Sequence, residues 1–348
     1  MNPYQELGPT AFWRTGVADV PAADISGLWT PKWPIGPDSR IATTGSCFAQ
    51  HFGAALRARG YAWLNKEPAP APLPAEARKA FNYEVFSART GNIYTARQLR
   101  QWLAWAHDPA TMPEEVWTRD GRWFDPFRPL IERDGFASEA ELRAARRTTL
   151  AALLAAAREA DVFVFTLGLT ECWRHRQLGH EYPVCPGTIA GAFDAETHMF
   201  VNQGFAEILD DMVQAIALLR RLQPAIRILL TVSPVPLTAT ASGQHVLVAT
   251  SHSKSVLRAV AGTLAATFDH CDYFPSYEII TAPPFRGMFY APNLRTVTEA
   301  GVGFVMGSFF AALGPQAERP VPPPDYAANE GDADPLCDDA ALEQFAKR

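Results

Sequence analysis

The sequence predicts a three-layer α/β fold with a mostly parallel sheet. Two continuous apolar runs, 161–167 and 226–232, are typical of strands that are buried on both faces. Each run is followed by a long segment with helical spacing, at 203–222 and 253–267. Strands that alternate with helices in this way indicate a parallel sheet with helices on both sides. The chain has 348 residues, of which 48% are hydrophobic, and it can therefore bury a large core.

Local patterns predict the remaining elements. A short strand at 40–44 runs into a helix at 47–59, and 61–64 has the pattern of a second strand. The segment that follows, about 65–158, is mostly helical and is expected to be an insertion in the α/β domain. Further along the chain we expect a helix near 95–105, a hairpin with an Asp-Gly turn at 117–124, a helix from Ser138 to Ala160, a short strand near Tyr273 and a final helix from Val297 to Leu313.

The two ends of the chain are expected to lie outside a single α/β domain that spans 39–314. Residues 1–38 are rich in Pro and Trp without a clear period, which predicts an irregular arm anchored on the body by Trp13, Trp29 and Trp33. Residues 315–348 are rich in Pro, Ala and Asp and contain eight acidic and three basic residues. Such a composition supports no core, so we expect a mobile acidic tail.

Composition narrows the choice of partners. The net charge is −6 and the acidic tail carries most of it, so the body has no strong field for nucleic acid. No apolar run is long enough for a membrane span, and the first residues lack the pattern of a signal peptide. The five cysteines are scattered without a C-x-x-C pair, which favours a reducing, cytoplasmic location. We expect no metal and no cofactor, and no pattern indicates the oligomeric state.

The most informative stretch is 43–51, where Ser46 lies between the strand at 40–44 and the helix that follows. A serine at such a junction can project its Oγ from the edge of the sheet. The start of the helix then offers unpaired N–H groups and a positive dipole end to an oxyanion. The other interpretation is that Ser46 only caps the helix. The local pattern leaves both open.

Six ordered blocks of the chain resemble the GSCFA family, which is itself similar to SGNH/GDSL-type serine hydrolases. The resemblance implies a flavodoxin-like or SGNH-like fold and a serine acyl-ester hydrolase or acyltransferase. Its substrate would be the acyl ester of a small molecule or of a carbohydrate. The blocks are Gly45–Ala49, Gly91–Leu99, Thr166–Glu171, Ser233–Leu237, Ser253–Arg258 and Tyr273–Glu278.

The resemblance also implies roles for two of these blocks. Ser46 would attack an acyl carbonyl, and its own backbone N–H would help to hold the oxyanion. Gly91 and Asn92 fall in the block that supplies a second oxyanion donor in SGNH enzymes.

The third block departs in part from the SGNH pattern. Gly168, Thr170 and Glu171 stand where SGNH enzymes carry Gly-x-Asn-Asp. Thr170 would donate a hydrogen bond in place of the Asn. Glu171 would orient a neighbour or bind a substrate hydroxyl, and the alternative for Glu171 is a buried structural carboxylate.

The late Asp-x-x-His of SGNH enzymes, which supplies their general base, is replaced here by Asn293 and Thr296. Neither side chain takes a proton at neutral pH, and Thr296 with Glu299 matches a capping box for the last helix instead. His252 is the first alternative base, because it follows the strand at 226–232 on the functional edge.

Other groups stay open as bases, namely His245, His175 and a Cys47–His51 pair at helical spacing. The missing base also keeps a second function open. The protein would then be a catalytically lapsed hydrolase that binds a ligand or acts as a scaffold.

Overall fold

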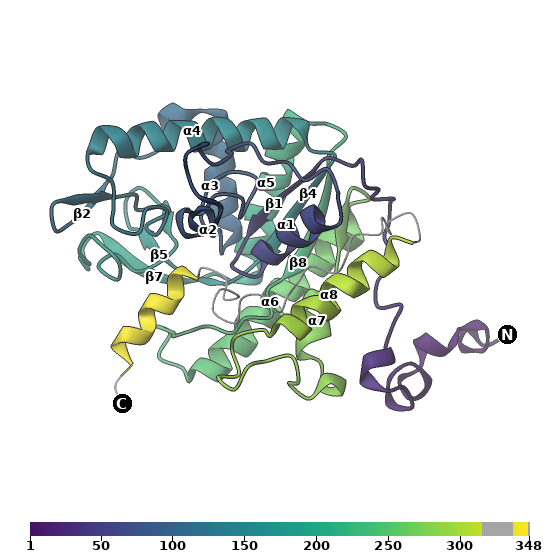
Figure 1. The fold of residues 1–348 in the computed structure, drawn as a ribbon. Helices are drawn as coiled ribbons and strands as arrows, with labels where there is room; N and C mark the ends of the chain where they lie inside the picture. The colour runs from purple at the N-terminus through teal and green to yellow at the C-terminus, as the bar shows by residue number, and fades with distance from the viewer. Residues whose placement is uncertain (315–336, 347–348) are drawn as a thin grey trace.

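The computed structural model describes residues 1–314 and 337–346, and its centre is a parallel sheet of four strands (Figure 1). The strand order is β1–β4–β8–β9, and all three neighbouring pairs are parallel. These strands confirm the predictions at 40–44, 161–167, 226–232 and near Tyr273. Their bounds are β1 Ile41–Gly45, β4 Val162–Leu167, β8 Arg227–Val232 and β9 Cys271–Tyr273.

The expected strand at 61–64 is reduced to a single parallel bridge between Trp63 and Ile41. Beyond Ile41 the outer edge of β1 is taken by Ser87, which exchanges hydrogen bonds with the backbone of Thr43. With the bridge at Trp63 counted as the second strand, the order is the flavodoxin-like 2-1-3-4-5. In such sheets ligands bind beyond the carboxyl ends of the strands, where the order reverses. Here that point lies between β1 and β4.

Helices cover both faces of the sheet, and the strand residues alternate between the two covers. Phe163 and Phe165 pack into the cluster formed with α3, α4, α5 and α6, whereas Val162 and Val164 pack into the cluster formed with α1, α7 and α8. This period of two produces the three layers. The helices are α1 Ala49–Ala58, α2 Ala75–Arg78, α3 Ala96–His107, α4 Glu139–Glu159, α5 Phe205–Leu222, α6 Val246–Thr267, α7 Ser276–Thr281 and α8 Glu299–Ala312.

The segment expected as a helical insertion is mixed. It contains α2, α3 and the predicted hairpin of β2 (Trp117–Arg119) and β3 (Arg122–Phe124). Asp120 and Gly121 at the turn both have positive φ, 51° and 74°, as a type I′ turn requires. Helix α4 packs on the sheet and leads into β4, so it is the crossover helix of the fold rather than part of an insertion.

A second sheet follows β4 directly and was not predicted. It has three antiparallel strands in the order β6–β5–β7, which are β6 Glu181–Tyr182, β5 Glu171–His175 and β7 His198–Asn202. The strands are short, and β5 pairs with β7 across the long segment between His175 and His198. The local sequence therefore carries little signal for them.

Two helix starts differ from expectation. Helix α6 begins at Val246, about two turns before the expected start, so His252 lies within the helix rather than in the loop before it. Helix α8 begins at Glu299 with Thr298 as its N-cap, whose side chain accepts a hydrogen bond from the Gly301 amide. The expected capping box from Thr296 to Glu299 is therefore wrong.

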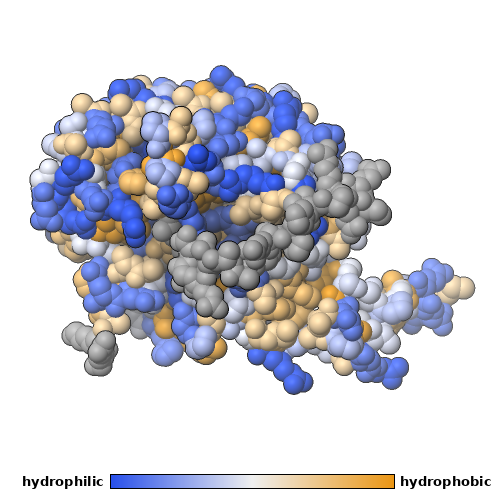
Figure 2. Space-filling view, viewed as in Figure 1, coloured by the Kyte–Doolittle hydropathy of each residue, from blue (hydrophilic) through white to orange (hydrophobic). Residues whose placement is uncertain are grey.

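The N-terminal arm is only partly attached to the body. Its first half consists of short 3₁₀ and π turns that stand away from the domain (Figures 1 and 2). Trp13 is 67% exposed there, so it does not anchor the arm as expected. Trp29 and Trp33 are buried, and Trp29 Nε1 donates to Asp272 while its ring stacks on Phe309.

The described part of the acidic tail, residues 337–346, forms a 3₁₀ helix, η10 (Asp338–Phe345). It lies at the lower left of Figure 1, in yellow, and Gln344 donates to the carbonyl of Thr188. This part is packed rather than mobile as expected, and the rest of the tail, 315–336 and 347–348, lies outside the described residues. Within the described ranges, every helix is too short or too polar to cross a bilayer.

Candidate active site

Ser46 lies in the bend between β1 and α1 and is almost completely buried, at 1% exposure. The preceding Gly45 has φ +142°, and a Cβ at that position would lie 2.6 Å from the carbonyl oxygen of Thr166. A glycine is therefore required immediately before the serine. Ser46 Oγ makes no hydrogen bond to any described residue, so it does not cap α1. The side chain is held in place but left without a structural task.

The backbone N–H of Ser46 donates to the carbonyl of Thr166, at 3.1 Å. This hydrogen bond ties the end of β1 to β4. Because the amide is already paired, the expectation that it helps to hold an oxyanion is not supported in this conformation. A donor to an oxyanion must come from elsewhere.

Residues 91–94 cross the gap between the ends of β1 and β4. The Ile93 amide donates to the carbonyl of Gly45 (2.8 Å), and the carbonyl of Tyr94 accepts from the amides of Gly168 (2.9 Å) and Leu169 (3.0 Å). This segment therefore brings the second block of the sequence to the switch point of the sheet.

The side-chain amide of Asn92 is oriented by α1. Its Oδ1 accepts a hydrogen bond from Gln50 Nε2, at 3.0 Å, and Gln50 lies one helical turn after Ser46. With its oxygen engaged by Gln50, the amide presents Nδ2 as a donor on the other side. The role of Asn92 as an oxyanion donor stays a prediction.

Gly91 is required by the backbone at its position. It has φ +66°, and a Cβ there would lie 3.2 Å from the Cβ of Arg128. The guanidinium of Arg128 is buried, pairs with Asp125 at 2.8 Å and donates to the carbonyl of Arg89 at 2.8 Å. This buried ion pair holds the chain just before Asn92 in place.

Gly168 forms the floor beneath Ser46. A Cβ on Gly168 would lie 2.8 Å from the Cβ of Ser46 and 3.1 Å from the ring of Tyr94. Its carbonyl oxygen accepts a hydrogen bond from Lys254 Nζ, at 2.7 Å. Lys254 is on α6 and is 1% exposed. Its buried amino group therefore contacts the glycine that packs on Ser46.

Residues 40–309 match the model of the GSCFA family. This chain belongs to the GSCFA family. The matched region runs from the start of β1 into α8 and contains Ser46, Asn92, Gly168 and Lys254. No curated protein and no solved structure matches the chain.

In this GSCFA protein the hydroxyl and the amide of Thr170 both have partners within the chain. Its hydroxyl donates to Asn202 Oδ1 at 2.7 Å, and its amide donates to Ser253 Oγ at 3.1 Å. Both contacts fasten the start of β5 to β7 and α6. The hydroxyl proton is therefore engaged, and Thr170 does not supply the donor expected in place of Asn.

Glu171 lies at the edge of a cavity and accepts a hydrogen bond from Thr240, at 2.7 Å. Burial raises the pKa of its carboxyl, and the hydrogen bonds from Thr240 and the Ala241 amide, with the charge of His252, oppose this in part. Its described partners are groups of the chain itself, so both the structural and the substrate-binding interpretations of Glu171 remain compatible with the geometry.

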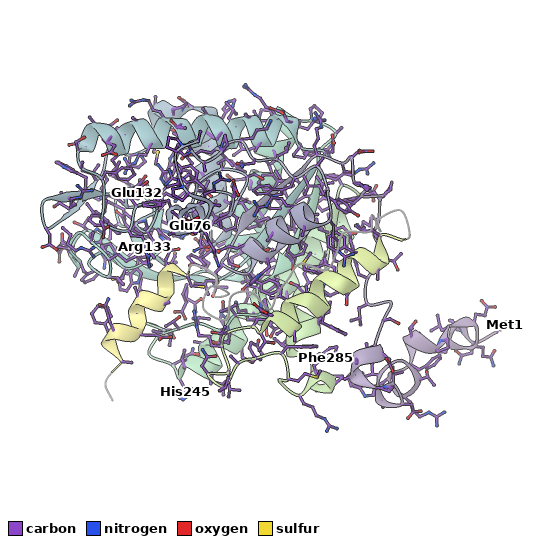
Figure 3. All side chains as sticks on the ribbon, in the orientation of Figure 1. Met1, Glu76, Glu132, Arg133, His245 and Phe285 are labelled. Atoms are coloured by element: carbon purple, nitrogen blue, oxygen red, sulfur yellow. The ribbon has the colours of Figure 1, made fainter. Side chains whose placement is uncertain are left out.

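His252 and His245 both lie on α6. His252 is exposed and, among the described residues, makes no side-chain hydrogen bond; its charge acts on Glu171. His245 caps the helix by accepting from the Leu247 amide, at the lower edge of the body in Figure 3. Lys254, two residues after His252, faces the serine side of the helix. Lys254 was not predicted as a site residue, although it stands in the Ser253–Arg258 block.

The remaining histidines considered as bases are engaged elsewhere. His175 accepts from two backbone amides of its own turn, and its ring lies 5.0 Å from that of His180. Burial, with the charge of Lys79, lowers the pKa of His51 to about 4. Cys47 packs in the core under α1 at 3% exposure. A Cys47–His51 thiolate pair has no support in this arrangement, because the histidine is neutral at pH 7.

The segment that stands in place of Asp-x-x-His forms a closed turn. Asn293 Oδ1 accepts from the amides of Arg295 (3.0 Å) and Thr296 (2.9 Å), and Asn293 Nδ2 donates to Thr296 Oγ1 (3.0 Å). The two side chains therefore satisfy each other and shape the approach to α8. Their role is structural, as the sequence indicated, although the cap itself is Thr298.

The C-terminal helix η10 reaches into the site. The carboxylate of Asp338 accepts from Asn92 Nδ2 at 2.7 Å and from the Tyr94 hydroxyl at 3.1 Å, and the Asp338 amide donates to that hydroxyl at 3.0 Å. Asp338 is 4% exposed. No sequence pattern connects a tail residue with the second block, so this contact was not predicted. Within the described ranges, no group of His, Cys, Asp or Glu side chains is arranged to hold a metal ion.

Proposed function

We propose that this GSCFA protein is a serine acyl-ester hydrolase or acyltransferase with Ser46 as its nucleophile. The observation that carries the proposal is the placement of Ser46 Oγ. It is buried at the switch point of the sheet, has no partner among the described residues, and lies against Gly168. A structural serine in such a place would be expected to satisfy its hydroxyl. An unsatisfied hydroxyl held between strand ends is the arrangement that a nucleophile needs.

The reaction follows from these positions. Ser46 Oγ attacks the ester carbonyl while a base takes its proton, and the amide of Asn92 donates to the oxyanion that forms. Collapse of this intermediate expels the alcohol, which receives the proton from the base. The acyl group on Ser46 then passes to water in hydrolysis, or to the hydroxyl of a second substrate in transfer.

Two residues are candidates for the base. His252 is the one expected from the sequence, and it is exposed on α6. Lys254 is the one that its location favours, because its Nζ contacts the carbonyl of Gly168, and Gly168 packs on Ser46. A lysine accepts a proton only in its neutral form. We place Lys254 ahead of His252 because of this position beside Gly168.

A fluorophosphonate probe tests the nucleophile. We expect covalent labelling of the wild-type protein at one site and no labelling of Ser46→Ala, with thermal unfolding showing that both are folded. Labelling of the Ser46→Ala variant at the wild-type rate would exclude Ser46.

The same assay ranks the bases. Removing a general base lowers the rate by about 10²- to 10⁴-fold. We expect a loss in that range for Lys254→Met and a change of less than about threefold for His252→Ala. The opposite result would return the role to His252.

The second candidate function is a lapsed hydrolase that binds a ligand in the same pocket. The turn formed by Asn293 and Thr296 favours it, because these side chains fill the positions of the usual base and its partner. The two functions differ in their response to Asn293→Asp combined with Thr296→His. A protein that is unlabelled before and after this change, yet folded, would support the binding function.

We also propose a substrate class and a cellular location. The site is suited to the acyl ester of a small molecule or of a carbohydrate, and the near-neutral body argues against nucleic acid as a partner. Cys47, Cys172, Cys185 and Cys271 form no disulfide among the described residues. This fits the cytoplasmic location that we propose.

A further inference from the structure

A cavity of about 480 Å³ begins at Leu169, the residue after Gly168. Its walls come from β5, from β7, from the loop at 237–241 and from η10. Most of the lining side chains are apolar, among them Leu169, Trp173, Val184, Phe200, Leu237 and Phe345.

Two polar side chains of the cavity, Glu171 and Thr240, are already hydrogen-bonded to each other. Glu171 accepts from the Thr240 hydroxyl at 2.7 Å, and Thr240 also shares a hydrogen bond with Ser242, at 2.7 Å. The volume lies within the range of small-molecule sites, about 300–1,000 Å³. A cavity with a mostly apolar lining is matched to a hydrocarbon rather than to a sugar, whose hydroxyls would lose hydrogen bonds to water on entering it.

We propose that this cavity holds the apolar acyl chain of the ester, an inference that rests on the proposed function. The carbonyl carbon would lie at Ser46, and the chain would run past Gly168 and Leu169 toward Trp173. The position of the cavity supports this, because its first wall residue follows directly on the glycine that touches the nucleophile.

The test is a series of p-nitrophenyl esters from acetate to octanoate. Full burial of one methylene raises kcat/KM about fourfold. Octanoate has about six more methylenes than acetate, so even with incomplete burial we expect octanoate to exceed acetate by at least about 50-fold. Ala239 lines the cavity and is exposed, so Ala239→Trp narrows the cavity without disturbing the core. This variant should lower the ratio of octanoate to acetate about tenfold or more. Ala151→Trp, on the exposed side of α4, is the matched control and should keep the wild-type ratio.

Binding is measured separately from catalysis. The Ser46→Ala protein should bind decanoate, detected by calorimetry, and Ala239→Trp in that background should weaken binding. A chain-length series that is flat, or that Ala239→Trp leaves unchanged, would overturn the inference even if Ser46 is labelled. If Ser46 is unlabelled while decanoate binds in this pattern, the proposed function fails and the apolar site stands.

An independent observation concerns Asp338. Its carboxylate takes the Asn92 amide that the proposed mechanism needs for the oxyanion. Ser46, Asn92 and Tyr94 are all buried at 5% exposure or less in the presence of this contact. We infer that η10 closes the site in this conformation and that substrate must displace Asp338. In the closed conformation, the Asp338 carboxylate accepts the hydrogen bond that the oxyanion of the substrate would accept from Asn92.

The rate of labelling by the fluorophosphonate tests this closure. Asp338→Ala breaks charge-assisted hydrogen bonds, and we expect labelling of Ser46 to rise about tenfold or more. Glu343→Ala removes the same charge from the exposed side of η10 and should leave the rate unchanged. A rate in Asp338→Ala that is equal to wild type or slower would overturn the closure. A slower rate would make Asp338 a residue that positions Asn92.

Discussion

Glycines set the geometry around the candidate nucleophile. Gly45 allows the chain to turn at Ser46 against the Thr166 carbonyl, and Gly168 lets the end of β4 approach the Ser46 Cβ. Neither contact tolerates a side chain, since a Cβ would approach atoms of the neighbouring strand or of Ser46 within 2.8 Å. The chemistry of the site therefore depends on residues that carry no functional group.

Gly168→Ala should impair the site more than the fold. The added methyl must displace Ser46 or Tyr94, and a displacement of about 1 Å costs about 100-fold in rate. Overpacking of this kind lowers the free energy of unfolding by about 1–3 kcal/mol. Labelling kinetics and urea unfolding measure the two effects. Gly36→Ala is the control, because no atom lies within 4 Å of the position of its Cβ. Equal labelling of Gly168→Ala and wild type would show that Ser46 adapts.

His51 should make stability fall in mild acid. Burial lowers its pKa from 6.5 to about 4 in the folded state, so between these pH values the unfolded chain binds a proton that the native state does not. The free energy of unfolding therefore decreases as the pH falls from 6.5 to 4, by about 2 kcal/mol from this group. His51→Gln should show a correspondingly smaller difference between urea unfolding at pH 7 and at pH 4.5. Identical pH dependence in both proteins would contradict the effect.

At the scale of elements, different residues cap α8 and close the turn before it. Thr298 caps the helix, accepting from Gly301 and donating to the carbonyl of Phe289. Asn293 and Thr296 close the preceding turn. A rebuilt Asp-x-x-His at those two positions would therefore disrupt a turn and leave the cap intact.

The two threonines should differ in their effect on stability. Thr298→Ala removes the cap and should lower the free energy of unfolding by about 1 kcal/mol. Thr296→Ala removes one hydrogen bond from a partly exposed turn and should cost about 0.5 kcal/mol or less. Urea unfolding of the two variants side by side measures the difference. The reverse order would restore Thr296 as the cap.

At the scale of the whole molecule, the arm and the described part of the tail differ from the structures that their compositions predict. The arm is anchored chiefly from its second half, where Trp29 packs on Phe309 and Phe274, while Val17 in the first half packs partly on the same core. The tail returns to the sheet edge through Asp338. Both ends of the chain thus contact the body at a few specific residues.

Trp29 and Trp13 form a matched pair for testing the arm. Trp29→Ala empties a buried site and should cost about 3–5 kcal/mol, which lowers Tm by about 5–10 °C. Trp13→Ala changes an exposed side chain and should leave Tm within about 1 °C. Calorimetry of both variants checks this. A loss of several degrees for Trp13→Ala would mean that the first half of the arm also docks.

By itself the sequence determined the four parallel strands, most of the helices, the hairpin and the place of Ser46 at the end of β1. These features depend on local patterns, such as apolar runs, helical spacing and turn residues, that each segment carries alone. The order of blocks along the chain also pointed to Asn92 and Gly168, whose chemical roles stay predictions.

Only the tertiary structure decided what each polar group at that edge is bonded to. The Ser46 amide is taken by Thr166, the Thr170 hydroxyl by Asn202, and Lys254 by Gly168. Asn92 meets Asp338 across 246 positions of sequence. A hydrogen bond needs a partner within about 3 Å, and which partner arrives there depends on how distant segments pack rather than on any local pattern.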